Sequence, residues 1–240
     1  MANPILNKSF AQEGILDGEV MSINGAILKS IFLLLTIILS SAYTWKLAIA
    51  GYADKMWLLT FGGAIVAFIT GLVVVWVKPK ISPILSFIYA VCEGLFLGGI
   101  SVMYEASSHG IVLKAIFATF TVMGVMLFLY MTRLIRMSEK FRAFILTATA
   151  SIALIYLIQI GASFFGRSIP LIFGSGAVGI GFSLFVIAIA ALNLIADFYV
   201  IEEGSNNRLP KIYEWVGAVG LMFSLVWLYL ELLRLFAKRN

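Results

Sequence analysis

The chain has 240 residues, of which 62% are hydrophobic and 12% are charged. A soluble domain is usually about 45–50% apolar and about 25% charged, so this composition indicates a polytopic membrane protein. The net charge of +5 is typical of loop lysines and arginines that set membrane topology, and no basic cluster with interleaved aromatic residues predicts a nucleic-acid partner.

The first 25 residues are predicted to be a polar cytoplasmic tail. They contain Glu13, Asp17 and Glu19 and no apolar run of their own, so we expect no cleavable signal peptide.

Seven apolar segments follow, each about as long as the 20 residues that a membrane-spanning helix needs. The connections are short, so segments that are neighbours in sequence are expected to be antiparallel neighbours in space. The predicted fold is an all-α polytopic membrane protein, with residues 26–240 as a single seven-helix transmembrane domain. The segments lie near residues 27–45, 57–77, 82–104, 112–132, 143–165, 171–200 and 212–236.

The distribution of basic residues favours a cytoplasmic N-terminus. Of the 17 lysines and arginines, ten then fall in segments that face the cytoplasm, as the positive-inside rule requires. Seven spans place the C-terminus outside, although Arg234, Lys238 and Arg239 make that end basic. Either the basic end is tolerated there, or one segment is re-entrant and both ends are inside.

The third segment places Glu93 near the middle of the membrane. An ionised carboxylate at that depth costs about 2.5–3.5 kcal/mol on insertion scales, so such groups usually face a water-filled cavity or a partner. The alternative is a protonated carboxyl group that is hydrogen-bonded to neighbouring backbone. Gly94 and Gly98 form a G-x-x-x-G pattern, which predicts close packing against another helix.

The sixth segment begins with GSGAVG at residues 174–179 and ends at Asp197. The glycine pattern resembles a dinucleotide-binding loop, but no strand or βαβ unit surrounds it, so Gly176 and Gly179 are interpreted as packing or helix-breaking positions. Asp197 follows a run with no ionisable side chain back to Arg167. Asp197 therefore either faces a cavity or a partner helix, or lies in the headgroup zone near Glu202 and Glu203.

The seventh segment carries acids, glycines and a hydroxyl group on one helical face. Such a face is not suited to lipid, so we expect this helix to be buried among the others. The face comprises Glu214, Gly217, Gly220, Ser224, Trp227 and Glu231.

The residues do not predict an enzyme. An intramembrane aspartyl protease needs two aspartates on facing helices, and only Asp197 lies within a predicted span. Cys92 and His109 are each the only residue of their type, so no histidine metal cluster is possible. We expect no cofactor.

Three stretches in this order and spacing resemble the Bax inhibitor family of membrane proteins: YAVCEGLFLGG in the third segment, IADFYVIEEG ending the sixth, and LYLELLRLF in the seventh. The resemblance covers nearly all of the chain after residue 25. The connection IEEGSNNRLPKIYEW resembles a bacterial branch, which implies the bacterial inner membrane.

The resemblance implies a seven-helix fold with the last helix at its centre and a pH-sensitive calcium leak. It implies a pair of proton-sharing aspartates, of which Asp197 matches the first. Alignment on the arginine of LYLELLRLF puts Ser224 at the second position, and Glu214 or Glu231 could substitute for it. A basic residue near the third helix, which can latch onto these acids in relatives, corresponds to Lys78 or Lys80.

The first functional hypothesis is a passive path for Ca²⁺ or another cation, lined by Asp197, Glu93 and Glu214 and gated by their protonation. Asp197 and Glu214 are the candidate metal ligands, and Ca²⁺ or H⁺ the transported partner. The alternative is a modulator of a membrane quality-control protease that uses the N-terminal tail, residues 1–25, as its contact and has no transport activity.

Overall fold

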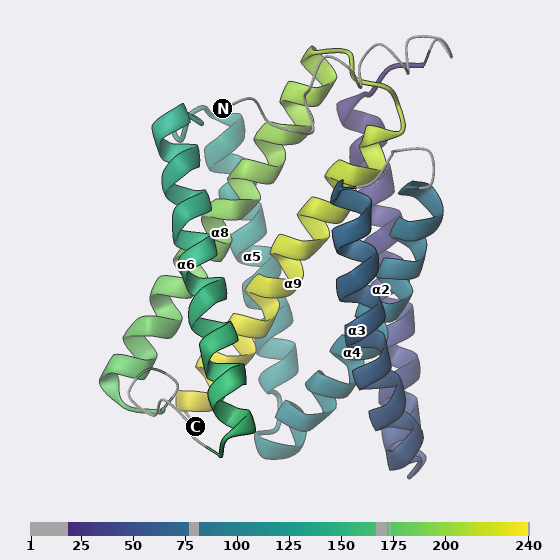
Figure 1. The fold of residues 1–240 in the computed structure, drawn as a ribbon, viewed down its shortest axis with the longest axis vertical. Coiled ribbons are helices and arrows are strands. Elements are labelled where there is room, and N and C mark those ends of the chain that lie inside the picture. The colour runs from purple at the N-terminus through teal and green to yellow at the C-terminus, as the bar shows by residue number, and fades with distance from the viewer. Residues whose placement is uncertain (1–18, 77–81, 167–171, 173, 240) are drawn as a thin grey trace. The chain divides into compact units, whose positions relative to one another are not determined.

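The computed structural model describes residues 19–76, 82–166, 172 and 174–239. Within these ranges the chain forms seven long α-helices, each of which is apolar and long enough to cross a membrane. The predicted all-α membrane fold with seven spans is thereby confirmed. The helices, labelled in Figure 1, are α2 (Ile23–Ile49), α3 (Ala53–Trp76), α4 (Ser82–Ser107), α5 (Ile111–Met131), α6 (Glu139–Phe164), α8 (Ala177–Asn206) and α9 (Tyr213–Arg239).

Serine side chains begin two of the helices. The Ser22 hydroxyl accepts a hydrogen bond from the Gly25 N–H at 3.0 Å, and Ser138 accepts one from the Phe141 N–H at 3.2 Å. Each satisfies a backbone donor that has no partner inside the helix. Because Ser22 is the cap, α2 begins at Ile23 and includes the last three residues of the stretch predicted to be a polar tail.

The sixth span is shifted relative to its prediction. Helix α8 begins at Ala177, six residues later than expected, and continues to Asn206 rather than ending near residue 200. Residues 174–176 form a bend before it, as expected for a glycine-rich stretch that loses much backbone entropy in a helix. At the other end, Glu202 and Glu203 are good helix formers and extend the helix past its apolar run.

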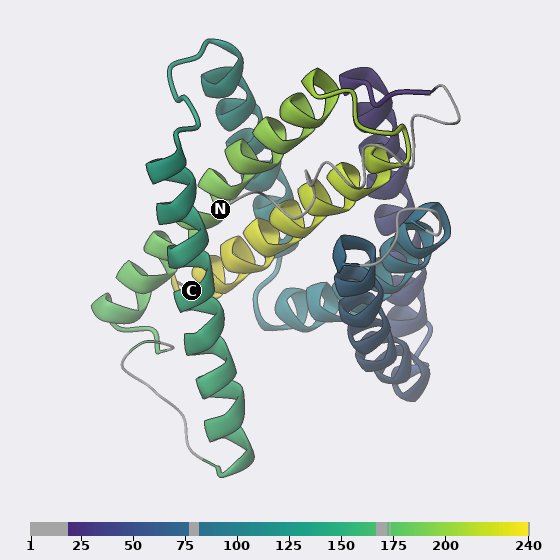
Figure 2. The same cartoon turned by 45° about the horizontal axis from the view of Figure 1, so that its top comes forward.

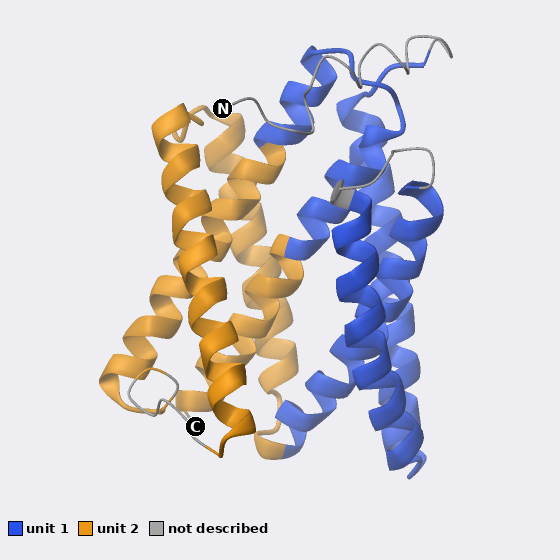
Figure 3. Cartoon of the chain, viewed as in Figure 1, with its two compact units in different colours: residues 1–106, 199–223 blue, residues 107–198, 224–240 orange. Residues whose placement is uncertain are grey.

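The chain divides into two compact units, shown in Figure 3. The first comprises residues 1–106 and 199–223, and the second comprises residues 107–198 and 224–240. Helices α8 and α9 contribute residues to both units.

Close packing through glycine joins the helices of the first unit. A Cβ atom on Gly94 of α4 would contact the Ser40 hydroxyl and the Ile37 backbone of α2, and one on Gly98 would contact the Ser41 backbone. Figures 1 and 2 show α2, α3 and α4 side by side. These glycines therefore allow α4 and α2 to approach backbone to backbone.

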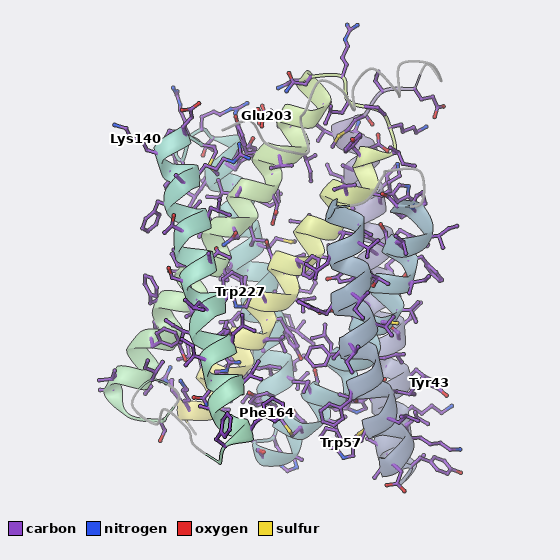
Figure 4. All side chains as sticks on the ribbon, viewed as in Figure 1. Tyr43, Trp57, Lys140, Phe164, Glu203 and Trp227 are labelled. Carbon is purple, nitrogen blue, oxygen red and sulfur yellow. The ribbon has the colours of Figure 1, made fainter. Side chains whose placement is uncertain are left out.

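The second unit has an apolar cluster between α6 and α8. Ile152 of α6 is buried with Val186 and Ile189 of α8, and the α9 side chain Trp227, labelled in Figure 4, packs against them. By contrast, Phe164 at the end of α6 is 85% exposed, as expected for a side chain that contacts lipid in a membrane protein.

Helix α9 is the most buried of the seven. In its most apolar window 67% of the residues are buried, against 11% in α6. This agrees with the burial predicted from its glycine- and acid-bearing face.

Candidate functional site

In the second unit, Asp197 lies on α8 next to Ser224 of α9. The Ser224 hydroxyl lies near the Asp197 carboxyl group. Asp197 is partly buried, and its Oδ2 atom is fully buried with no hydrogen-bond partner among the described residues. Buried polar atoms are nearly always paired, so this oxygen marks a place for a proton, a water molecule or a cation.

The pair formed by Asp197 and Ser224 is the pair of positions that the sequence alignment matched to the two family aspartates. With serine as the second member, the pair carries one carboxyl group instead of two. Proton sharing between two acids is therefore not available to it. The Ser224 hydroxyl can instead donate to a carboxylate or accept from a carboxylic acid, so it can partner both protonation states of Asp197.

Glu231 of α9, also in the second unit, is held by an arginine and a tyrosine. Its Oε1 atom accepts hydrogen bonds of 2.7 Å from the Arg234 guanidinium and 2.7 Å from the Tyr156 hydroxyl, and Arg234 also donates to that hydroxyl at 2.6 Å. The Glu231 side chain is 1% exposed, and its Oε2 atom has no partner among the described residues. The i, i+3 spacing of Glu231 and Arg234 is the sequence signal that could have predicted this ion pair.

Glu214, at the start of α9 in the first unit, is neutralised by a lysine. Its buried carboxylate forms an ion pair with Lys29 of α2 and accepts hydrogen bonds from the Ser22 N–H at 2.8 Å and the Ser22 hydroxyl at 3.1 Å. Gly25 has no Cβ atom, which leaves room for this carboxylate. Lys29 also lies 5.3 Å from the centre of the Trp215 ring. These contacts make Glu214 an anchor between α2 and α9, a role that the sequence did not suggest.

Glu93 belongs to a buried polar face of α4 in the first unit. It is 8% exposed and lies one helical turn from Tyr89, which is fully buried and whose ring centre is 4.9 Å from that of Phe223. The Tyr89 hydroxyl and the Ser86 hydroxyl one turn earlier have no hydrogen-bond partner among the described residues. Three polar groups thus follow one face of α4.

Two further predictions concern the candidate latch lysines and the candidate metal ligands. Lys78 and Lys80, the candidate latch, lie outside the described residues. Among those described, no group of three or more histidine, cysteine, aspartate or glutamate side chains could hold a metal ion. Metal binding by Asp197 and Glu214 stays a prediction, and the two residues belong to different compact units.

The predicted packing glycines also differ from one another. A Cβ on Gly217 would lie 2.9 Å from Ile201, and one on Gly179 would contact the Gly174 carbonyl oxygen. At Gly176 a Cβ would meet nothing within 4 Å, and the residue lies in the bend before α8, which fits the helix-breaking alternative rather than the packing one. Gly220 is partly exposed.

Seven apolar helices, with buried glutamates on α4 and α9 and a buried carboxyl oxygen on α8, define a multi-pass membrane protein with polar sites inside its spans. A family model described as Bax inhibitor 1 like matches residues 3–240, so the chain belongs to the Bax inhibitor 1 like family. The resemblance inferred from the sequence is thereby confirmed, and assignment to a bacterial branch remains a prediction. No curated protein matches the chain.

Proposed function

We propose that the protein is a pH-sensitive passive leak for Ca²⁺ or a similar cation, gated by protonation of a buried carboxyl group. The observation that carries this proposal is the Asp197 carboxyl group, which lies near the Ser224 hydroxyl and has one buried oxygen without a partner among the described residues. Family membership adds support for an integral membrane protein of this kind.

The charge state of Asp197 is the variable that this mechanism needs. An ionised carboxylate inside a span costs about 2.5–3.5 kcal/mol on insertion scales unless water, a cation or a donor compensates it. Protonation removes that cost and also removes the oxygen ligand that a hard cation prefers. A change of pH therefore shifts the site between a cation-attracting state and a neutral state, which makes it a proton-driven switch.

The contacts of the buried acids distinguish acids that anchor α9 from the acid that we propose as the gate. Glu214 and Glu231 each have a basic partner, so we assign them to anchoring α9. Glu93 has the polar face of α4 around it in the first unit, and a place for it on a cation path stays a prediction from the sequence. We place the gate at Asp197 with Ser224.

Calcium flux in proteoliposomes, measured from pH 5 to 8, tests the proposal. Wild-type protein should conduct Ca²⁺ with a rate that changes with pH, and Asp197→Asn should lose that pH dependence because the amide does not titrate. Asp54→Asn is the matched control, since Asp54 is exposed in the first turn of α3. A pH dependence that survives in Asp197→Asn, or is lost equally in Asp54→Asn, would contradict the gate.

The alternative function, modulation of a membrane quality-control protease, is favoured by one observation in the first unit. The segment that leads out of the N-terminal tail is fixed to the α8–α9 connection by a Met21 N–H to Leu209 carbonyl bond of 2.7 Å and a Glu19–Lys211 ion pair of 3.0 Å. A partner bound to the tail would thus act on the residues just before α9.

Deletion of residues 2–17 tests this second function, because it removes the tail and keeps the fixed segment. The proposal expects protease co-purification to be lost and any ion flux to be retained. Retained co-purification by the truncated protein would contradict it.

A further inference from the structure

Lys238, in the last turn of α9, contacts three oxygen atoms of the second unit with its ammonium group. The Lys238 ammonium lies 3.0 Å from the Gly179 carbonyl oxygen, 3.0 Å from the Ser183 hydroxyl oxygen and 3.4 Å from the Ile172 carbonyl oxygen. A lysine ammonium has three N–H donors and no acceptor, so this cage of three oxygens can accept all of its donors.

Backbone packing that requires glycine builds the cage. A Cβ atom on Gly179, in the first turn of α8, would contact the Gly174 carbonyl oxygen and lie 3.1 Å from the Ile172 carbonyl oxygen. Gly179 thus leaves room for the Gly174 and Ile172 carbonyl groups beside the first turn of α8. Ser183, one turn further on, is 1% exposed. Two of the three oxygens therefore belong to buried residues of α8, and the third comes from the half-buried Ile172.

We propose that the oxygen atoms of Ile172, Gly179 and Ser183 form a binding site for a monovalent cation of the size of K⁺. In the wild-type protein the Lys238 ammonium group occupies this site. All three ligands are neutral oxygens, the kind that replaces the hydration shell of K⁺ in carbonyl-lined sites. Ca²⁺ prefers carboxylate ligands, and the cage contains none. An ammonium group and K⁺ are similar in size, so the free ion and Lys238 are alternative occupants.

Two charged residues near the cage affect whether Lys238 or a free ion occupies it. Glu231 attracts the Lys238 ammonium and Arg234 repels it. Glu231 and Arg234 also form an ion pair, and the partial negative charge at the C-terminus of α9 favours a cation nearby. Removal of the Lys238 charge therefore leaves three oxygen atoms without their cation, near the Glu231–Arg234 ion pair. This inference does not depend on whether the protein conducts Ca²⁺.

Thermal unfolding of the purified protein in detergent tests the site, with KCl, NaCl, CaCl₂ and choline chloride compared at equal ionic strength. Lys238→Met keeps most of the side-chain length and removes the charge. We expect its Tm to rise by about 3 °C or more in KCl relative to choline chloride, because an ion that binds only the folded state stabilises it. The wild type should not distinguish the salts, since Lys238 fills the cage.

Two further variants separate a site from a general charge effect. Arg239→Met removes an exposed charge from the adjacent residue and should show no preference among cations. Addition of Ser183→Ala to Lys238→Met should remove at least half of the K⁺ effect, because it deletes one ligand. Purification of Lys238→Met in both KCl and choline chloride extends the test to a variant that folds poorly, since recovery only in KCl would also support the site.

Three results would overturn the proposal. They are an equal Tm of Lys238→Met in all four salts, an equal response of Arg239→Met, and failure to recover Lys238→Met in either salt. Each would show that Lys238 only anchors the end of α9.

Discussion

The buried acids of this protein differ by the partner that each one has. Glu214 is bound to Lys29 and Glu231 to Arg234, so each forms a pair of opposite charges. For Asp197 no ion pair is found within the described ranges, and the group near its carboxyl is the neutral Ser224 hydroxyl. A cationic partner offsets part of the cost of burying a carboxylate charge, whereas a neutral partner offsets less of it, so that such a carboxylate depends more on water, protons or metal ions. This difference separates anchoring acids from the proposed gate.

At the Glu214–Lys29 pair, removal of one charge should be costly. We expect Glu214→Gln to lower the free energy of unfolding by about 3 kcal/mol, because it leaves a largely buried lysine without its partner. The double change with Lys29→Met should cost less than the two single changes added together. Denaturant unfolding in detergent measures this, and Glu139→Gln, at an exposed site, is the control. Strictly additive losses would show that the pair is not coupled.

At the scale of the helices, missing side chains determine how closely the backbones approach. Gly94 and Gly98 bring α4 onto α2, and at Gly63 of α3 a Cβ would lie 2.6 Å from the Cys92 carbonyl oxygen of α4. In lipid there is little hydrophobic force between helices, so such close packing supplies much of their association energy. A single added methyl group therefore tests each contact.

Gly94→Ala should destabilise the protein by about 1–3 kcal/mol, the usual cost of overpacking, because the new Cβ contacts the Ile37 backbone, which cannot rotate away. Gly62→Ala on α3 is the matched control, since a Cβ there meets nothing within 4 Å. The control should be neutral or stabilising by up to about 1 kcal/mol, the helix propensity difference between the two residues. Unfolding in detergent compares them, and equal effects would refute the packing role of Gly94.

At the scale of the whole molecule, the chain passes between the two compact units inside two of its helices. The chain passes from the second unit to the first between residues 198 and 199 in α8, and back between 223 and 224 in α9. Asp197 and Ser224 both belong to the second unit, and along the chain each is within two residues of a passage.

The orientation of the whole chain is testable by cysteine labelling. In a Cys92→Ala background, a membrane-impermeant maleimide should label Asp54→Cys on intact cells and reach Lys140→Cys only after lysis. Both native residues are exposed, and Lys140 is labelled in Figure 4. This pattern follows from a cytoplasmic N-terminus and seven spans. Labelling of Lys140→Cys on intact cells would reverse the orientation.

The sequence by itself determined the membrane class, the seven spans and the family. These follow from local patterns, because an apolar run long enough to cross a bilayer predicts a membrane-spanning helix whatever the helix packs against. The motifs around Glu93, Asp197 and Glu231 were sufficient for the family. Helix ends were less accurate, as the six-residue shift of α8 shows, because caps and bends depend on a few polar residues and glycines.

Only the tertiary structure decided which partner each acid has. Lys29 and Glu214 are 185 positions apart, and Lys238 is 59 positions from Gly179, so no local pattern could connect them. From the sequence, Lys29 was one of ten charges that set topology, and Glu214 was a candidate metal ligand. The reason is physical: a carboxylate's role is set by the donors and charges within a few ångströms, and in a helical membrane protein those come from other helices.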